Sequence, residues 1–101
     1  MSAGRVTERY THTYRALTNP LRRKLLAYLL VERAGSPKEL SEIFGEAFKR
    51  VYPNIKALEA GGLIELTETD SRMGGTIHVY GPTDLAARFA GLLADELKGR
   101  A

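Results

Sequence analysis

Apolar residues recur every three or four positions along much of the first half of the chain, which predicts a series of helices. The first helix is expected from about Arg5 to Leu17. The second should begin at Asn19-Pro20, because Asn suits the N-cap and Pro the first helical position, and should stop near Gly35. The apolar positions are Val6, Tyr10, Tyr14 and Leu17 in the first helix, and Leu21, Leu25, Tyr28 and Leu29 in the second.

Two more helices are expected at short intervals. The run Ser36-Pro37-Lys38-Glu39 is a capping-box pattern with proline in the first turn, so a short third helix should begin there and end at Gly45. A fourth helix should follow about one turn later and end at Gly61-Gly62. Their expected inner faces are Leu40, Ile43 and Phe44 in the third, and Phe48, Val51, Ile55 and Leu58 in the fourth.

After this point the period changes to two, which predicts a two-stranded hairpin. In the first strand Ile64 and Leu66 alternate with polar residues; in the second, Ile77 and Val79 do so. The polar stretch 70–75 forms the tip. The segment Gly81-Pro82-Thr83 should break the second strand and cap a last helix with Leu85, Phe89, Leu92 and Leu93 on its apolar side. The fold class is therefore mainly α with a small β-hairpin (α+β), and we expect one domain over residues 1–101.

The composition is that of an ordinary soluble globular protein, with 44% hydrophobic and 27% charged residues. No cysteine is present, which excludes disulfides and thiolate metal sites. The longest apolar run, from Leu25 to Val31, is too short to cross a membrane, and the start of the chain lacks a signal-peptide core. We therefore expect a cytoplasmic protein.

The distribution of charge is more informative than the net charge of +3. Three cations and no acid lie between Lys49 and Lys56, and Arg22, Arg23 and Lys24 are consecutive. Each cluster taken alone is as consistent with a solvated helix surface as with a binding site. The clusters gain meaning only from where the fold places them.

The order and spacing of several motifs resemble the ArsR-type winged helix-turn-helix regulators of bacteria. The resemblance extends from about residue 14 to 82. It rests on the runs 17–22, 36–46, 55–59 and 62–64, on Val51, and on Gly74-Gly75-Thr76 with Tyr80. It implies a homodimer in which the first and last helices form the two-fold interface. It also implies that the fourth helix enters the major groove of DNA while the hairpin, the wing, touches the minor groove or the backbone.

In that arrangement the exposed side of the fourth helix would contact DNA. Arg50 and Asn54 are the candidates for base edges, and Tyr52 for a base or the backbone. Lys49 and Lys56 are the candidates for phosphates. The alternative is that these residues form only the exposed side of a surface helix.

Three further cations are candidate DNA contacts. Arg72 lies at the wing tip, where a cation could enter a narrow minor groove. Arg22 could reach a phosphate, the dimer partner or solvent. Lys38 begins the third helix, whose N-terminus already favours anions.

Pro53 departs from the family pattern and removes one backbone hydrogen bond from the fourth helix. Either the helix is kinked near residues 49–52, or its regular part begins late, with Pro53 in the first turn. Our hypothesis is that Pro53 sets the angle at which the helix docks in the groove.

The first and last helices carry more apolar surface than one core would use, at Tyr10, Tyr14, Phe89, Leu92 and Leu93. A two-fold interface would bury this surface and place two recognition helices about one DNA turn apart. The alternative is that both helices only cover the core of one chain.

The sequence favours a sequence-specific regulator that binds double-stranded DNA as a homodimer and represses transcription. The alternatives are a winged-helix protein-interaction module and a non-specific architectural DNA-binding protein. Neither an enzyme nor a metal site is indicated, because no catalytic motif is present and His12 and His78, the only histidines, lack a ligand pattern. No cofactor and no membrane contact are expected, and a small-molecule effector is left open.

Overall fold

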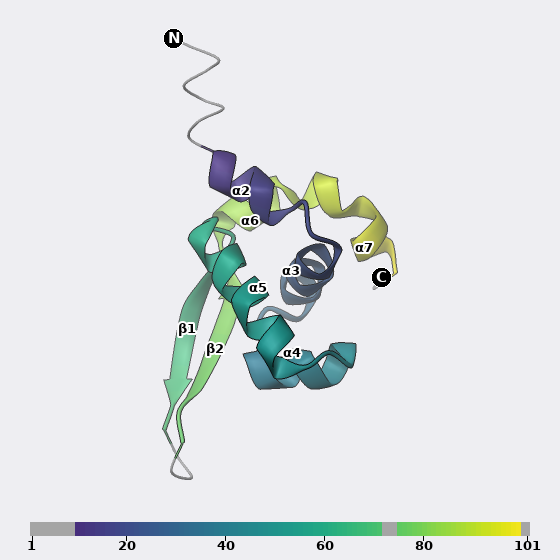
Figure 1. Cartoon of the computed structure of the whole chain (residues 1–101). Helices are drawn as coiled ribbons and strands as arrows, with labels where there is room; N and C mark the ends of the chain where they lie inside the picture. The colour runs from purple at the N-terminus through teal and green to yellow at the C-terminus, as the bar shows by residue number, and fades with distance from the viewer. Residues whose placement is uncertain (1–9, 72–74, 100–101) are drawn as a thin grey trace.

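The computed structural model describes residues 10–71 and 75–99. They form a group of helices from which a two-stranded antiparallel hairpin projects (Figure 1). The elements are α2 (Thr11–Ala16), α3 (Pro20–Glu32), α4 (Pro37–Phe44), α5 (Phe48–Ala60), β1 (Ile64–Asp70), β2 (Ile77–Pro82), α6 (Asp84–Arg88), the 3-10 helix η2 (Ala90–Leu93) and α7 (Ala94–Lys98). The predicted class, mainly α with one small hairpin, is confirmed.

The predicted helix starts are confirmed by their caps. The Asn19 side chain accepts a hydrogen bond from the Arg22 N–H at 3.1 Å. Ser36 and Glu39 form the reciprocal capping box, with hydrogen bonds of 3.1 and 3.0 Å. α4 ends at Gly45, which is left-handed with φ 64°, a conformation that glycine adopts without strain.

Two predicted helix boundaries are wrong. The first helix does not run through Tyr10, which is a turn residue, and the expected residues before it lie outside the described part. α3 ends at Glu32 instead of near Gly35, because Arg33 turns left-handed with φ 74°. The early end leaves Gly35 free to pair with Tyr80 of β2 through backbone hydrogen bonds of 3.0 and 2.8 Å.

The last helix, expected to be continuous, is divided into α6, η2 and α7. Thr83 caps α6 as predicted, since its Oγ1 accepts a hydrogen bond from the Ala86 N–H. Gly91 lies within η2, and glycine is a poor helix former, which is consistent with a break there.

The hairpin is present, but the simple alternation predicted for its strands is wrong. Ile64 and Tyr80 are buried where the hairpin meets the helices, whereas Leu66 and Ile77 are exposed. The reason is geometric: beyond this end the hairpin passes α4 with only an open cleft between them, so its apolar side chains have no buried core to enter (Figure 1). The strand ends within the predicted segment, since β2 stops at Pro82 and Thr83 caps α6. A Cβ at Gly81 would lie 2.8 Å from the Arg33 carbonyl oxygen.

The core lies between α3, α5 and the near end of the hairpin. Its fully buried members include Leu25, Leu26, Leu29, Leu40, Val51, Ile55, Leu58, Leu63 and Leu93. Two side chains predicted to point inward, Ile43 and Phe48, are instead about half exposed. No helix in the described ranges is long and apolar enough to cross a membrane.

Candidate nucleic-acid interface

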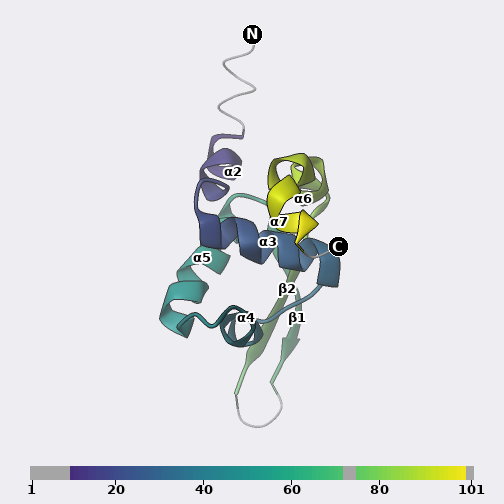
Figure 2. The same cartoon turned by 90° about the vertical axis from the view of Figure 1, so that its right-hand side faces the viewer.

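α5 lies on the surface of the helical group, packed on α4 and α3. The hairpin extends past α4 in both views (Figure 1 and Figure 2). The buried stripe of α5 is Val51, Ile55 and Leu58. The exposed side of the helix, available to a ligand, includes Lys49, Arg50, Tyr52 and Lys56. α4, α5 and the hairpin therefore form one side of the molecule on which a long partner could lie.

The cations predicted on α5 are at the surface. Lys49 is exposed, and the Arg50 side chain is 65% exposed beside Glu46, at 3.4 Å. Lys56 pairs with Glu59 at 2.7 Å, and this hydrogen bond raises the pKa of Lys56. Exposed pairs of this kind contribute little to stability, so an anionic ligand can displace the acids at low cost.

Asn54 is differently placed from its neighbours. Its Oδ1 accepts a hydrogen bond from Arg22 Nε at 2.8 Å, and its Nδ2 donates to the Arg50 carbonyl at 2.8 Å. The amide therefore ties α3 to α5, and it keeps one further N–H and one further lone pair for a ligand. Arg22 also donates to the Arg15 carbonyl at 3.4 Å. No local pattern predicts the Arg22–Asn54 link, because these two residues are 32 positions apart.

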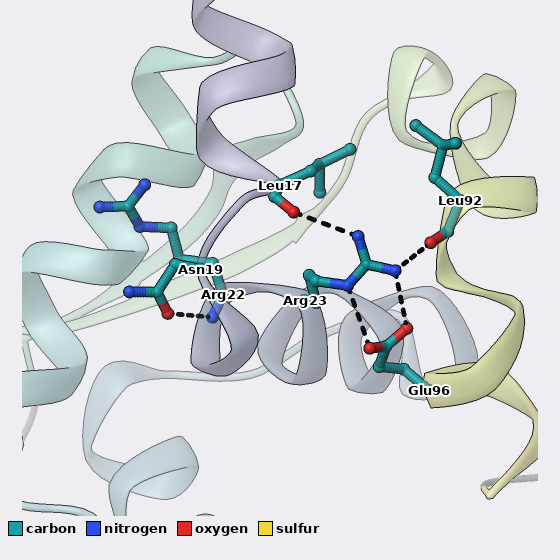
Figure 3. Close-up of polar contacts among 6 residues, drawn as sticks. All are labelled: Leu17, Asn19, Arg22, Arg23, Leu92 and Glu96. Atoms are coloured by element: carbon teal, nitrogen blue, oxygen red, sulfur yellow. Dashed lines mark hydrogen bonds and ion pairs between the residues drawn. The ribbon is translucent and has the colours of Figure 1, made fainter.

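Arg23, next to Arg22 in the sequence, is directed elsewhere. Figure 3 shows its guanidinium between Leu17, Leu92 and Glu96. It donates to the Leu17 carbonyl at 3.1 Å, to the Leu92 carbonyl, and to both carboxylate oxygens of Glu96 at 3.0 and 3.3 Å. This pairing lowers the pKa of Glu96. The two adjacent arginines therefore contact different helices: Arg22 joins α3 to α5, and Arg23 joins α3 to α7.

Tyr52 lies at the surface as expected, but it is accompanied by Phe48. The two rings stack with centroids 5.7 Å apart and planes 16° apart, and Lys56 Nζ lies 6.0 Å from the Tyr52 ring. Sequence reasoning missed Phe48 as a surface residue because its spacing continues the apolar stripe. Phe48 is the first residue of α5 and precedes the buried residues of the stripe. This position at the helix end is the feature that could have indicated an exposed side chain.

The remaining candidates are scattered around this surface. Lys38 is exposed in the first turn of α4 and lines a cleft of about 320 Å³ with residues of α5 and β2. Arg72 lies outside the described residues. Within the described ranges no three histidine, aspartate or glutamate side chains gather as metal ligands would.

The candidate dimer residues lie at the start of α2, within α2 and in the α6–α7 region. These elements are at the end opposite to that toward which the hairpin extends (Figure 1 and Figure 2). Phe89 packs edge-on against Tyr10 and Tyr14, with centroids 6.0 and 5.3 Å apart. Tyr14 and Leu92 are half exposed. Leu93 is fully buried in the core of its own chain, so its surface is not available to a partner.

No protein-family model matches the chain, and no curated protein sequence does. Solved structures do match. HlyU from Vibrio cholerae has 19% identity and a TM-score of 0.71, over 88% of this chain and 90% of that one. The homodimeric winged helix-turn-helix DNA-binding domain of Mb0332 from Mycobacterium bovis, a possible ArsR-family regulator, has 22% identity and a TM-score of 0.70, over 95% and 89%. A MarR mutant from E. coli has 11% identity and a TM-score of 0.66, over 97% and 77%.

The helices, the hairpin and these likenesses define a winged helix-turn-helix fold, with α4 and α5 as the helix-turn-helix and β1–β2 as the wing. Solved structures that share the fold include the ArsR family transcriptional regulator RHA00566 and the possible ArsR-family regulator Mb0332. The fold implied by the sequence resemblance is confirmed.

Proposed function

We propose that this chain is a transcription regulator that binds double-stranded DNA with α5 in the major groove. The observation that carries the proposal is the position of the exposed cations of α5 beside a projecting hairpin. The likeness to solved transcription regulators supports it. A helix with cations on its exposed side and a hairpin at its flank matches the shape and charge of duplex DNA.

The residues of α5 take different roles in this proposal. Lys49 and Lys56 bind phosphates, which position the protein without reading sequence. Arg50 reads a base edge, because its exposed ion pair with Glu46 is released at low cost. Asn54 holds Arg22 and the Arg50 carbonyl through its amide, and its remaining N–H and lone pair can read a base edge.

The cations outside α5 extend the same surface. Lys38 reaches the backbone from the start of α4, and Arg22 reaches it from α3. Arg72 contacts the minor groove from the wing tip. The protein acts as a homodimer, pairing through α2 and the α6–α7 region, and represses by occupying a promoter.

Selection of bound sequences from a random DNA pool tests this function. We expect a palindromic site with half-sites about one helical turn, roughly 10 base pairs, apart. Preference for that site should persist as salt rises, whereas a non-specific architectural protein would show only the salt-dependent component of binding. Little binding at physiological salt would favour the protein-interaction module instead.

Substitutions on α5 test the assigned roles. Lys49→Ala should weaken binding to all sequences to a similar extent, and Arg50→Ala should relax preference at one position. Asn54→Ala relaxes one position if the amide reads a base directly, and disturbs several if it acts by holding Arg22 and Arg50. Identical behaviour of Lys49→Ala and Arg50→Ala would show that the roles are wrongly assigned.

A further inference from the structure

The first half of α5 carries two aromatic rings that are not part of the core. Phe48 is 51% exposed and Tyr52 is 40% exposed, whereas Val51 and Ile55 of the same helix are fully buried. The rings lie one helical turn apart and stack nearly parallel. Stacking on each other leaves part of both rings facing away from the protein.

These rings line the cleft of about 320 Å³ between α5, the start of α4 and β2. From the β2 side Ile77, which is 49% exposed, adds further apolar surface. Scattered exposed apolar residues need no explanation, but three that line one cleft indicate a binding surface.

The surroundings of the rings are positively charged. Lys38 lines the cleft, and Lys56 Nζ, which pairs with the Glu59 side chain, lies 6.0 Å from the centre of the Tyr52 ring. The matching partner is therefore anionic and presents small apolar groups between its charges. The major groove of DNA has this character, because the C5 methyl groups of thymine project into a groove bordered by phosphates, and Phe is among the side chains that contact them.

We propose that Phe48 and Tyr52 contact thymine methyl groups and make the DNA preference depend on thymine at defined positions of each half-site. This inference rests on the proposed function, since α5 must enter the major groove. In this proposal the DNA sequence is recognised by apolar contacts with the two rings as well as by the polar contacts of Arg50. The exposed side of Phe48 thereby acquires a role.

The test uses the full chain and the sequence obtained by selection. Each thymine is replaced in turn by deoxyuridine, which lacks the methyl group but keeps the same hydrogen-bonding groups. Affinity is measured by fluorescence anisotropy. At contacted positions we expect about three- to fivefold weaker binding, the effect of losing one buried methyl group.

Variants assign the effect to the rings. In Phe48→Ala and Tyr52→Ala the ratio of thymine to deoxyuridine affinity should fall toward one at the contacted position. Tyr52→Phe, which keeps the ring and loses only the hydroxyl, should retain the ratio. Lys49→Ala should lower the affinity for both DNAs and leave the ratio unchanged. Because both aromatic residues are well exposed, circular dichroism should show that each variant remains folded.

Three results would overturn the inference, and they are distinguishable. Equal affinity for thymine and deoxyuridine at every position would leave the proposed DNA binding intact. It would show that the cleft does not contact thymine methyl groups. A ratio that persists in both alanine variants would place the methyl contact elsewhere. Failure of the selection to yield any bound DNA would overturn the proposed function and the inference together.

Discussion

At the scale of single residues, neighbours in the sequence have separate tasks. Arg22 and Arg23 are adjacent in the first turns of α3, yet Arg22 bonds to Asn54 on α5 and Arg23 to Glu96 on α7. The helix turns about 100° per residue, so consecutive side chains face different elements. α5 and α7 are thereby both fixed to α3.

The Arg23–Glu96 pair should make stability depend on pH. Because Arg23 lowers the pKa of Glu96 in the folded state, ionised Glu96 stabilises the fold above the ordinary glutamate pKa of about 4.3. This stabilisation is lost as the pH falls through the lower, folded-state pKa. Glu96→Gln should therefore reduce the free energy of unfolding by about 1 kcal/mol at pH 7. Urea denaturation from neutral to acidic pH measures the difference.

The neighbouring carboxylate provides the control for this experiment. Asp95 also lies in the first turn of α7, so Asp95→Asn removes the same charge from the same helix end without touching the Arg23 pair. Its effect should be smaller than that of Glu96→Gln. Equal stability of wild type and Glu96→Gln at pH 7 would contradict the role given to the pair, as would a difference that persists undiminished at strongly acidic pH.

At the scale of elements, the sequence predicted the starts of the helices, because a helix cap depends only on residues close together in the chain. Asn19, Ser36 and Thr83 cap helices as expected because capping involves only residues three positions apart. The end of α3 could not be predicted in this way, because it depends on pairing between Gly35 and the distant Tyr80. Likewise, whether the Phe48 side chain is buried depends on where the core ends. The spacing of apolar residues along the sequence does not show this.

The effect of Pro53 on α5 could not be predicted from the sequence, which left two alternatives open. α5 begins at Phe48, so Pro53 lies inside it and the alternative of a late-beginning helix is wrong. Proline has no N–H for the Lys49 carbonyl, four residues earlier. This region of the helix is exposed to solvent, where such a carbonyl can be solvated.

Replacement of Pro53 by Ala should separate stability from DNA recognition. Restoring the N–H and removing the ring should raise the free energy of unfolding, by up to about 3 kcal/mol, in urea denaturation. If Pro53 sets the docking angle, affinity for the selected site should fall and the preferred sequence should shift. Pro53→Ser restores the same N–H and should act in the same direction. An unchanged sequence preference and affinity in both variants would contradict the docking hypothesis.

At the scale of the whole molecule, the surfaces proposed for DNA and for a second copy are separate. The hairpin extends from one end, and α2 with α6 and α7 lies at the other (Figure 2). The sequence predicted four of the five candidate dimer residues at positions that are exposed or partly exposed, namely Tyr10, Tyr14, Phe89 and Leu92. It could not distinguish Leu93 from Leu92, because the break between α6 and α7 changes which of the two turns inward.

Charge placed on this surface should dissociate the proposed dimer without unfolding the chain. Light scattering at micromolar concentration should give wild type twice the mass of one chain. Tyr14→Asp and Leu92→Asp would bury an unpaired carboxylate at the two-fold interface, which should weaken dimerisation at least about tenfold. Ile77→Asp is the matched control, because Ile77 is equally exposed but lies on the hairpin, and this variant should remain dimeric. A monomeric wild type would overturn the dimer, and it would remove the reason to expect a palindromic site.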